Sequence, residues 1–331
     1  MQDADIRSAR FRAEREDDWR RLETVIADAE KHGLQRMPFA AARDLAALYR
    51  QATSSLAIAR EISLDRALLA YLEALTARAY LTVYAPQEPL GDVIGRFFAQ
   101  SAPQALRRAG PYLLIGFLSM GLGALVGYLL YIENASWFYV FVPSELAGGR
   151  NPGASTETLR AVIYDDDPSA HGLGAFAAFL FSHNSRIAIF IFGLGVFLCA
   201  PAILLTFYNG LILGAFMGLH VERGLGWDLL GWLSVHGVTE VSAICIACAG
   251  GVMLGASVLF PGQARRASAL QAAGRDAVKL AIVAALMLVA AAVLEGFARQ
   301  LVQSLEARLV LGWGVGLVWL VWILGRGRGR S

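Results

Sequence analysis

The stretch Val235-His236-Gly237-Val238-Thr239-Glu240 begins a long apolar run that continues to about Phe260. An apolar run of this length predicts a helix that spans a membrane. Its histidine and glutamate stand four residues apart, so on a helix they lie on one face, one turn apart. Because ionisable groups are costly inside a bilayer, this pair indicates a candidate functional site.

The composition of the whole chain is that of a membrane protein. Of its 331 residues, 56% are hydrophobic and only 17% are charged, whereas a typical soluble domain is about 25% charged. About half of the charged residues lie before residue 110, and most apolar runs lie after it. We therefore predict a cytoplasmic helical bundle with an interfacial helix at residues 1–110 and a transmembrane helical domain at residues 111–331.

Several function classes are disfavoured. The formal net charge is only +2 and the two signs are mixed, so we expect no nucleic-acid partner. The chain begins without the apolar segment of a signal peptide. Its three cysteines lie in apolar runs, so no disulfide framework is expected. No P-loop, G-x-S-x-G or G-x-G-x-x-G motif is present in a strand-helix setting, so we expect no cofactor.

The first 110 residues predict amphipathic helices. Residues 11–31, 41–60 and 66–84 each combine an apolar stripe with a charged face, and Asp65 is a suitable N-cap for the third. Three such helices fit a small bundle. Residues 92–109 alternate apolar and basic positions, which predicts a helix in the lipid headgroup region.

About six membrane spans follow, so the predicted fold class is an all-α polytopic membrane helix bundle. The candidates are residues 112–132, 187–200, 202–219, 237–259, 280–296 and 309–324. The second and third belong to one run that is too long for a single crossing. Pro201 lacks a backbone donor and is the expected turn, with Asn209-Gly210 as the alternative. The apolar residues 173–181 are expected to lie along the outer surface before the second span.

Basic residues set the orientation of such a bundle. With six crossings, three basic clusters fall on the same side of the membrane, which predicts that this side and both termini are cytoplasmic. The clusters are Arg107 and Arg108, then Arg265, Arg266, Arg275 and Lys279, then Arg326, Arg328 and Arg330. Glycines also recur at four-residue spacing within the spans, for example Gly123 and Gly127, or Gly210 and Gly214. Small residues one turn apart predict close helix packing, and they are compatible with a homodimer.

On this topology, polar residues from four spans gather near the outer surface. This predicted cluster comprises His183, Asn184, Arg186, Asn209, His220, His236, Glu240 and Glu295. Three interpretations are open. The groups hydrogen-bond one another and hold the bundle together, or they line a pathway for an ion, a proton or a lipid headgroup. The third is a metal or catalytic site, because His and Glu bind zinc, although the spacing is H-x-x-x-E and not H-E-x-x-H.

Several short motifs resemble one protein family. They are Phe181-Ser182-His183-Asn184-Ser185-Arg186, Tyr208-Asn209-Gly210 with Gly214, His236-Gly237 with Glu240, and Leu294-Glu295-Gly296-Phe297. Their order and spacing resemble the stage II sporulation protein M family. The N-terminal Leu48-Tyr49-Arg50, Leu56-Ala57 and Ala59-Arg60 are similar to the cytoplasmic part of its longer members. The last span and the Arg-Gly tail lie outside the pattern.

The resemblance implies a multi-pass protein of the bacterial inner membrane without established enzymatic activity. In spore formers the family member anchors cell-wall-degrading partners in the engulfment machinery. Longer members of the family also occur in bacteria that do not sporulate, where they are often encoded beside MoxR-type ATPases. Cell-wall-remodelling proteins, a cytoplasmic MoxR-type ATPase and membrane lipids are therefore the expected partners.

We hypothesise a non-enzymatic scaffold whose cytoplasmic domain docks a partner. A transporter or channel is the alternative, and an intramembrane metal-dependent hydrolase is a third.

Overall fold

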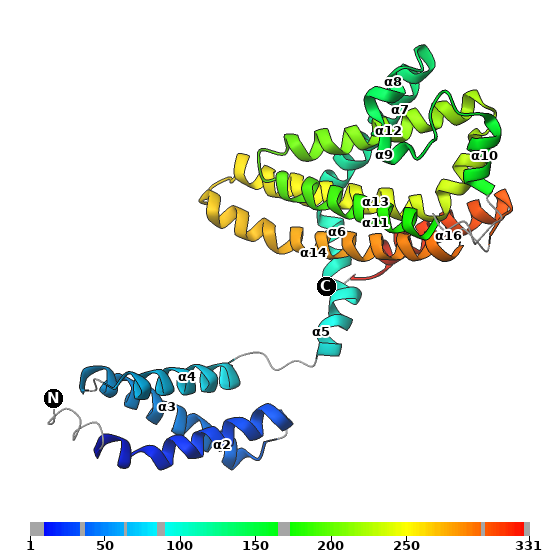
Figure 1. Cartoon of the computed structure of the whole chain (residues 1–331). Helices are drawn as coiled ribbons and strands as arrows, with labels where there is room; N and C mark the ends of the chain where they lie inside the picture. Colours follow the sequence, from blue (N-terminus) through cyan, green and yellow to red (C-terminus); the bar gives the residue numbers. More distant parts are fainter. Residues whose placement is uncertain are drawn as a thin grey trace. The chain divides into compact units, whose positions relative to one another are not determined.

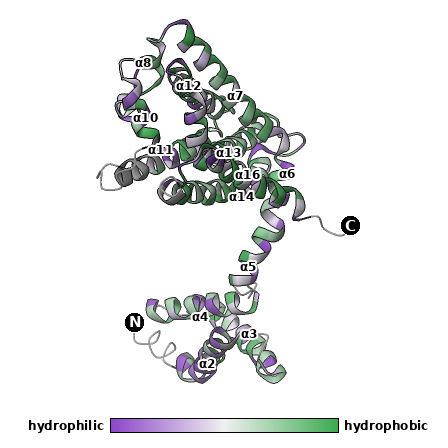
Figure 2. Cartoon of the chain, turned by 90° about the vertical axis from the view of Figure 1, so that its right-hand side faces the viewer, coloured by the Kyte–Doolittle hydropathy of each residue, from purple (hydrophilic) through white to green (hydrophobic). Residues whose placement is uncertain are grey.

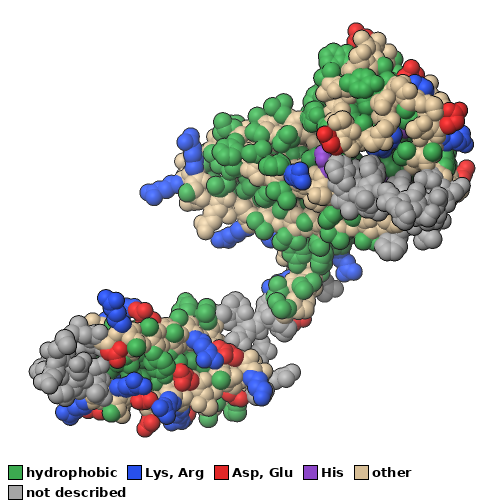
Figure 3. Space-filling view, viewed as in Figure 1, with side chains coloured by type: hydrophobic (Ala, Val, Ile, Leu, Met, Phe, Trp, Pro, Cys, Tyr) green, Lys and Arg blue, Asp and Glu red, His purple; other side chains and the backbone are tan. Residues whose placement is uncertain are grey.

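The computed structural model describes residues 10–33, 37–62, 65–84, 90–164, 173–298 and 302–327, and every regular element in these ranges is a helix (Figure 1). The all-α fold class is confirmed. The chain divides into two compact units, Met1–Val93 and Ile94–Ser331. Charged side chains cover the first unit densely, whereas the visible face of the second is largely apolar (Figure 3).

The first unit contains the three expected helices. They are α2 (Glu16–His32), α3 (Phe39–Ile62) and α4 (Arg66–Tyr84). Their apolar stripes meet in one core, in which Trp19, Leu22 and Leu72 are almost fully buried. The backbone N–H of Ala67 donates to the Asp65 side chain at 2.9 Å, which confirms the predicted N-cap.

One exposed ion pair joins two helices of this unit. The Arg78 guanidinium of α4 donates to both carboxylate oxygens of Glu30 in α2, at 2.8 and 2.6 Å. These hydrogen bonds stabilise the charged form and lower the pKa of Glu30. Because both side chains are about half exposed, the pair contributes little to stability.

In the second unit, short elements precede, connect and follow the long helices. They are α5 (Leu90–Arg96), which begins in the first unit, η2 (Phe97–Ser101), α6 (Ala102–Arg108), α8 (Trp137–Phe141), α9 (Ser144–Ala147), α10 (Thr156–Tyr164) and η3 (Leu294–Ala298). Both η elements are π-helical turns.

Five helices in the described residues are long and apolar enough to cross a membrane. They are α7 (Gly110–Glu133), α12 (Ala200–Glu222), α13 (Gly226–Leu259), the helix from Arg266 to Gly296 that comprises α14 (Arg266–Val293) and the start of η3, and α16 (Leu305–Gly325). Figure 2 shows these helices as predominantly hydrophobic. The chain is therefore a multi-pass membrane protein.

The predicted second span has the wrong bounds. Residues 187–200 cover only the end of α11 (Leu173–Leu194) and the turn that follows it. No proline interrupts residues 173–194, so the stretch expected to lie along the outer surface is instead the beginning of the same helix. The 22 residues of α11 extend about 33 Å at 1.5 Å per residue. This length suffices for a sixth crossing.

The turn between α11 and α12 lies just before Pro201. Leu198 and Cys199 adopt positive φ values of 63° and 67°, and α12 begins at Ala200 with the proline in its first turn. Pro201 fits there because the first turn of a helix needs no backbone donor. The alternative turn at Asn209-Gly210 is wrong, since α12 continues through both residues.

Glycines let α7 and α12 pack backbone against backbone. A Cβ added at Gly127 would lie 2.8 Å from the Leu211 Cα, and one added at Gly210 would lie 2.9 Å from the Gly123 Cα. Ordinary Cβ contacts are 3.4–4 Å. Side chains at these positions would therefore force the helices apart, and the predicted close packing of the glycines is confirmed.

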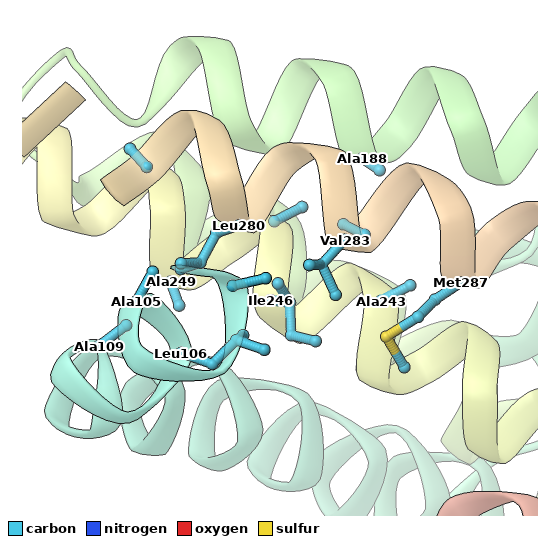
Figure 4. Close-up of a cluster of buried hydrophobic side chains, with 14 of the residues drawn as sticks. Ala105, Leu106, Ala109, Ala188, Ala243, Ile246, Ala249, Leu280, Val283 and Met287 are labelled. Carbon is cyan, nitrogen blue, oxygen red and sulfur yellow. The ribbon is translucent and has the colours of Figure 1, made fainter. Parts of the chain in front are cut away.

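The long helix α13 is the centre of the second unit. It packs against α7, α11, α12, α14 and α16. Small side chains fill its contacts with α6 and α14, where Figure 4 shows Ala105, Ala243 and Ala249 around Ile246 and Leu280. The segment from Ile94 to Ala109 belongs to this unit, and α6 is part of its core.

Candidate functional site: a polar cavity beside α13

A cavity of about 140 Å³ lies between α11, α12 and α13. Five residues of the predicted cluster line it, namely His183 and Asn184 of α11, Asn209 of α12, and His236 and Glu240 of α13. Apolar side chains such as Met120 and Phe216 complete the wall. The volume has room for roughly four water molecules, so it suits a small polar group.

The position of His236 and Glu240 follows from the helical repeat. They stand one turn apart on α13, so both face the cavity. The Asn184 side-chain amide donates to the Glu240 carboxylate and thereby links α11 to α13. His236 is buried, with its ring 5.3 Å from that of Trp232 in an edge-to-face arrangement. The apolar neighbours hold the imidazole in place at the cavity wall.

Glu295 does not line the cavity. It is 4% exposed and sits in the π-helical turn η3, which packs against α13. Its carboxyl group interacts electrostatically with that of Glu240. Single π-helical turns inside α-helices are frequent at functional sites.

The other two residues of the predicted cluster do not line the cavity. His220 is fully buried near the end of α12, where its Nδ1 lies 2.8 Å from the Phe216 carbonyl oxygen. Arg186 is exposed on α11. Position 186 is two residues from position 184, a rotation of about 200° around the helix, so Arg186 lies on the opposite side of α11 from the buried Asn184.

Arg150 is a cavity residue that the sequence analysis did not single out. It follows α9 in the connection between α7 and α10, yet it is only 6% exposed. Its Nε and Nη2 donate to the carbonyl oxygens of Ala147 and Leu146 at 3.0 and 2.9 Å, and its guanidinium lies 4.8 Å from the Phe216 ring centroid. A loop arginine gives no sequence signal of burial, and only the folding of this loop onto α12 brings it here.

A second polar cluster fastens α10 and α16 to the start of α13. Arg308 of α16 is 1% exposed and donates to the carbonyl oxygens of Val302 and Ile163 at 2.8 and 3.1 Å. Tyr164 donates to Asp228, and burial together with this hydrogen bond raises the pKa of Tyr164. This cluster supports the cavity, because Ile163 packs on Leu229 and Trp232, which line it.

The charges of the cavity define its chemistry. Arg150 offers a cation, Glu240 a carboxyl group, and two imidazoles and two amides offer both donors and acceptors. Within the described ranges, no three His, Cys, Asp or Glu side chains are grouped to hold a metal ion. The cavity wall therefore presents both signs of charge together with hydrogen-bond donors and acceptors.

These features define a polytopic all-α membrane protein with a polar cavity between its helices. The sequence model described as Stage II sporulation protein M matches residues 112–298, more than half of the chain. The chain therefore belongs to the stage II sporulation protein M family. Residues 9–85 match a second model, described as a domain of unknown function (DUF8413). No curated protein and no solved structure matches the chain.

Proposed function

We propose that this protein is a non-enzymatic scaffold of the bacterial inner membrane whose cavity binds a small polar group at the outer side. The single observation that carries this proposal is the convergence of Arg150 and five helix-borne polar residues, among them His236 and Glu240, on one cavity. Purely structural polar groups need no such space around them, whereas a recognition site does.

The N-terminal unit would dock a cytoplasmic partner in this proposal. Its three helices form their own core and carry many exposed charges, for example those of Glu30 and Arg78. A separate soluble unit on a membrane protein suits the recruitment of a cytoplasmic partner such as a MoxR-type ATPase. Both termini would then be cytoplasmic, as the basic residues predict.

Substitutions of two residues that line the cavity test this role. The variants Glu240→Gln and His236→Ala would be compared with Glu133→Gln, an exposed acid at the end of α7. Proteins cross-linked to the full chain in cells would be identified, and the unfolding of each purified variant would be measured. We expect both cavity variants to lose cross-linked partners while remaining folded. Unchanged partners and unchanged stability would rule out a functional cavity.

A transporter or channel is the second candidate. Glu240 of α13 and Glu295 of η3 favour it, because acids within membrane-spanning segments mark ion and proton pathways. Protein in liposomes that contain a trapped pH-sensitive dye would dissipate an imposed pH gradient if it conducts protons, and Glu240→Gln would stop this. The absence of any flux above that of empty liposomes would exclude the proton-conducting form of this alternative.

A further inference from the structure

A second, larger cavity lies on the opposite side of α13 from the polar one. It measures about 680 Å³ and is a groove whose floor includes Val238, Ser242 and Ile246 of α13. Helices α7 and α16 form its two walls and α6 closes one end. The groove faces positions 238, 242 and 246, whereas the polar cavity faces 236 and 240, so one helix separates two chemically different spaces.

The groove is lined almost entirely by apolar side chains. Phe117 of α7 and Leu317 and Leu320 of α16 stay about half exposed on its walls. The hydroxyl of Ser242 donates to the Val238 carbonyl oxygen of its own helix at 2.7 Å, so its hydrogen bond is satisfied without a polar ligand. Because both walls are membrane-spanning helices, the groove opens into hydrocarbon.

The volume of the groove matches a single acyl chain. It equals the volume of roughly 20 water molecules, and a methylene group takes about the volume of one water. The groove is therefore large enough for one long chain, but its volume is too small for another transmembrane helix, which is about 10 Å across and about 30 Å long. A gap of this kind would cost packing energy if it were empty.

One end of the groove carries positive charge. Arg107 of α6 lines it and donates to the carbonyl oxygens of Ile323, Arg326 and Gly327 at the end of α16. A guanidinium has five N–H donors, and these bonds use three of them. The remaining donors can bind a phosphate, and the exposed Arg326 adds a second positive charge nearby.

We propose that this groove binds one anionic phospholipid, with an acyl chain between α7 and α16 and its phosphate beside Arg107. The lipid completes the packing of α16, of whose apolar span only 11% is buried within the protein. The site differs from the polar cavity in position, in chemistry and in its ligand, so it does not depend on the scaffold role.

Native mass spectrometry of the full chain in mild detergent tests the proposal. The purified protein would be delipidated and then mixed with phosphatidylglycerol or with phosphatidylcholine of the same chains. We expect one phosphatidylglycerol to be retained per chain, about five-fold more strongly than phosphatidylcholine for each positive charge at the headgroup. Equal retention of the two lipids would refute the assignment of the phosphate to Arg107.

A pair of matched serines provides the groove variant and its control. Ser242→Leu places a larger side chain on the floor of the groove. Ser257→Leu is its control, because Ser257 lies on the same helix outside the groove and its hydroxyl also donates to a carbonyl oxygen of that helix. We expect Ser242→Leu to lower lipid retention at least ten-fold and Ser257→Leu to leave it unchanged, with both variants folded. Full retention by Ser242→Leu would overturn the proposal.

The charge at the groove end is tested in the same way. Arg107→Gln should abolish the preference for phosphatidylglycerol, whereas Arg265→Gln, an exposed arginine before α14, should keep it. A second copy of the chain is the other occupant to exclude. If the delipidated protein is a dimer that Ser242→Leu converts to monomers, the groove is a protein interface and the lipid site is wrong.

Discussion

The glycine contact between α7 and α12 makes a quantitative prediction about the stability of the membrane unit. We consider Gly127→Ala, with Gly121→Ala as its control on the same helix. A Cβ at Gly127 would lie 2.8 Å from the Leu211 Cα, whereas one at Gly121 would meet no atom within 4 Å. The two substitutions add the same methyl group, so any difference between them reports on the contact and not on helix propensity.

The magnitude follows from this geometry. The shortest ordinary contact of a Cβ is 3.4 Å, so the Leu211 Cα alone requires the two backbones to separate by 3.4 minus 2.8, or 0.6 Å, and the carbonyl oxygen of Leu211, which lies nearer still, requires more. The contact atoms are backbone and cannot rotate away. Overpacking of this kind costs about 1–3 kcal/mol. Gly121→Ala should leave the free energy of unfolding unchanged or raise it by up to about 1 kcal/mol.

Unfolding in mixed micelles with a rising fraction of dodecyl sulfate, followed by tryptophan fluorescence, measures this difference. Six of the seven tryptophans lie beyond residue 94, so the signal reports chiefly on the membrane unit. We expect Gly127→Ala to unfold at a lower dodecyl sulfate fraction than the wild type and Gly121→Ala at the same or a higher one. Equal midpoints for the two variants would show that α7 and α12 are not in backbone contact there.

Three further predictions concern other parts of the chain. Leu22→Ala should lower the free energy of unfolding of the first unit by about 2–5 kcal/mol, because Leu22 is fully buried. This loss would be measured as faster hydrogen exchange in α2, α3 and α4 of the full chain. An equal increase in the exchange rate of α7 would contradict the separation into two units. Because Arg78 lowers the pKa of Glu30 in the folded state, their pair stabilises the first unit above the unfolded pKa of about 4.3, and this contribution is lost as the pH falls through the lower folded value. Glu30→Gln should therefore speed exchange slightly at pH 7 and leave it equal to the wild type in strong acid, whereas the same difference at both pH values would argue against the pair. Arg308→Met leaves the carbonyl oxygen of Ile163 without its donor, which should lower the free energy of unfolding by about 3 kcal/mol. We expect faster proteolysis near α10, and resistance equal to that of the wild type would show that this cluster does not stabilise the protein.

Local patterns predicted the helices well because each pattern needs only neighbouring residues. The stripe of Trp19 and Leu22, the N-cap at Asp65 and the turn next to Pro201 all depend on the period of a helix or on the backbone of one residue. The bounds of α11 were harder to predict, because polar residues interrupt its apolar sequence. No local pattern distinguishes a helix that lies on the membrane surface from one that enters the membrane.

The sequence by itself determined that the chain is an all-α membrane protein, and it singled out the polar residues within the apolar segments. Hydropathy and helical period suffice for this because the bilayer forces every backbone polar group to bond within its own helix. Only the tertiary structure decided which polar residues share a space. His236 and Glu240 share a cavity with Asn184 and Arg150 because α11 packs on α13 and the loop after α9 folds onto α12, and contacts between distant segments leave no local pattern in the sequence.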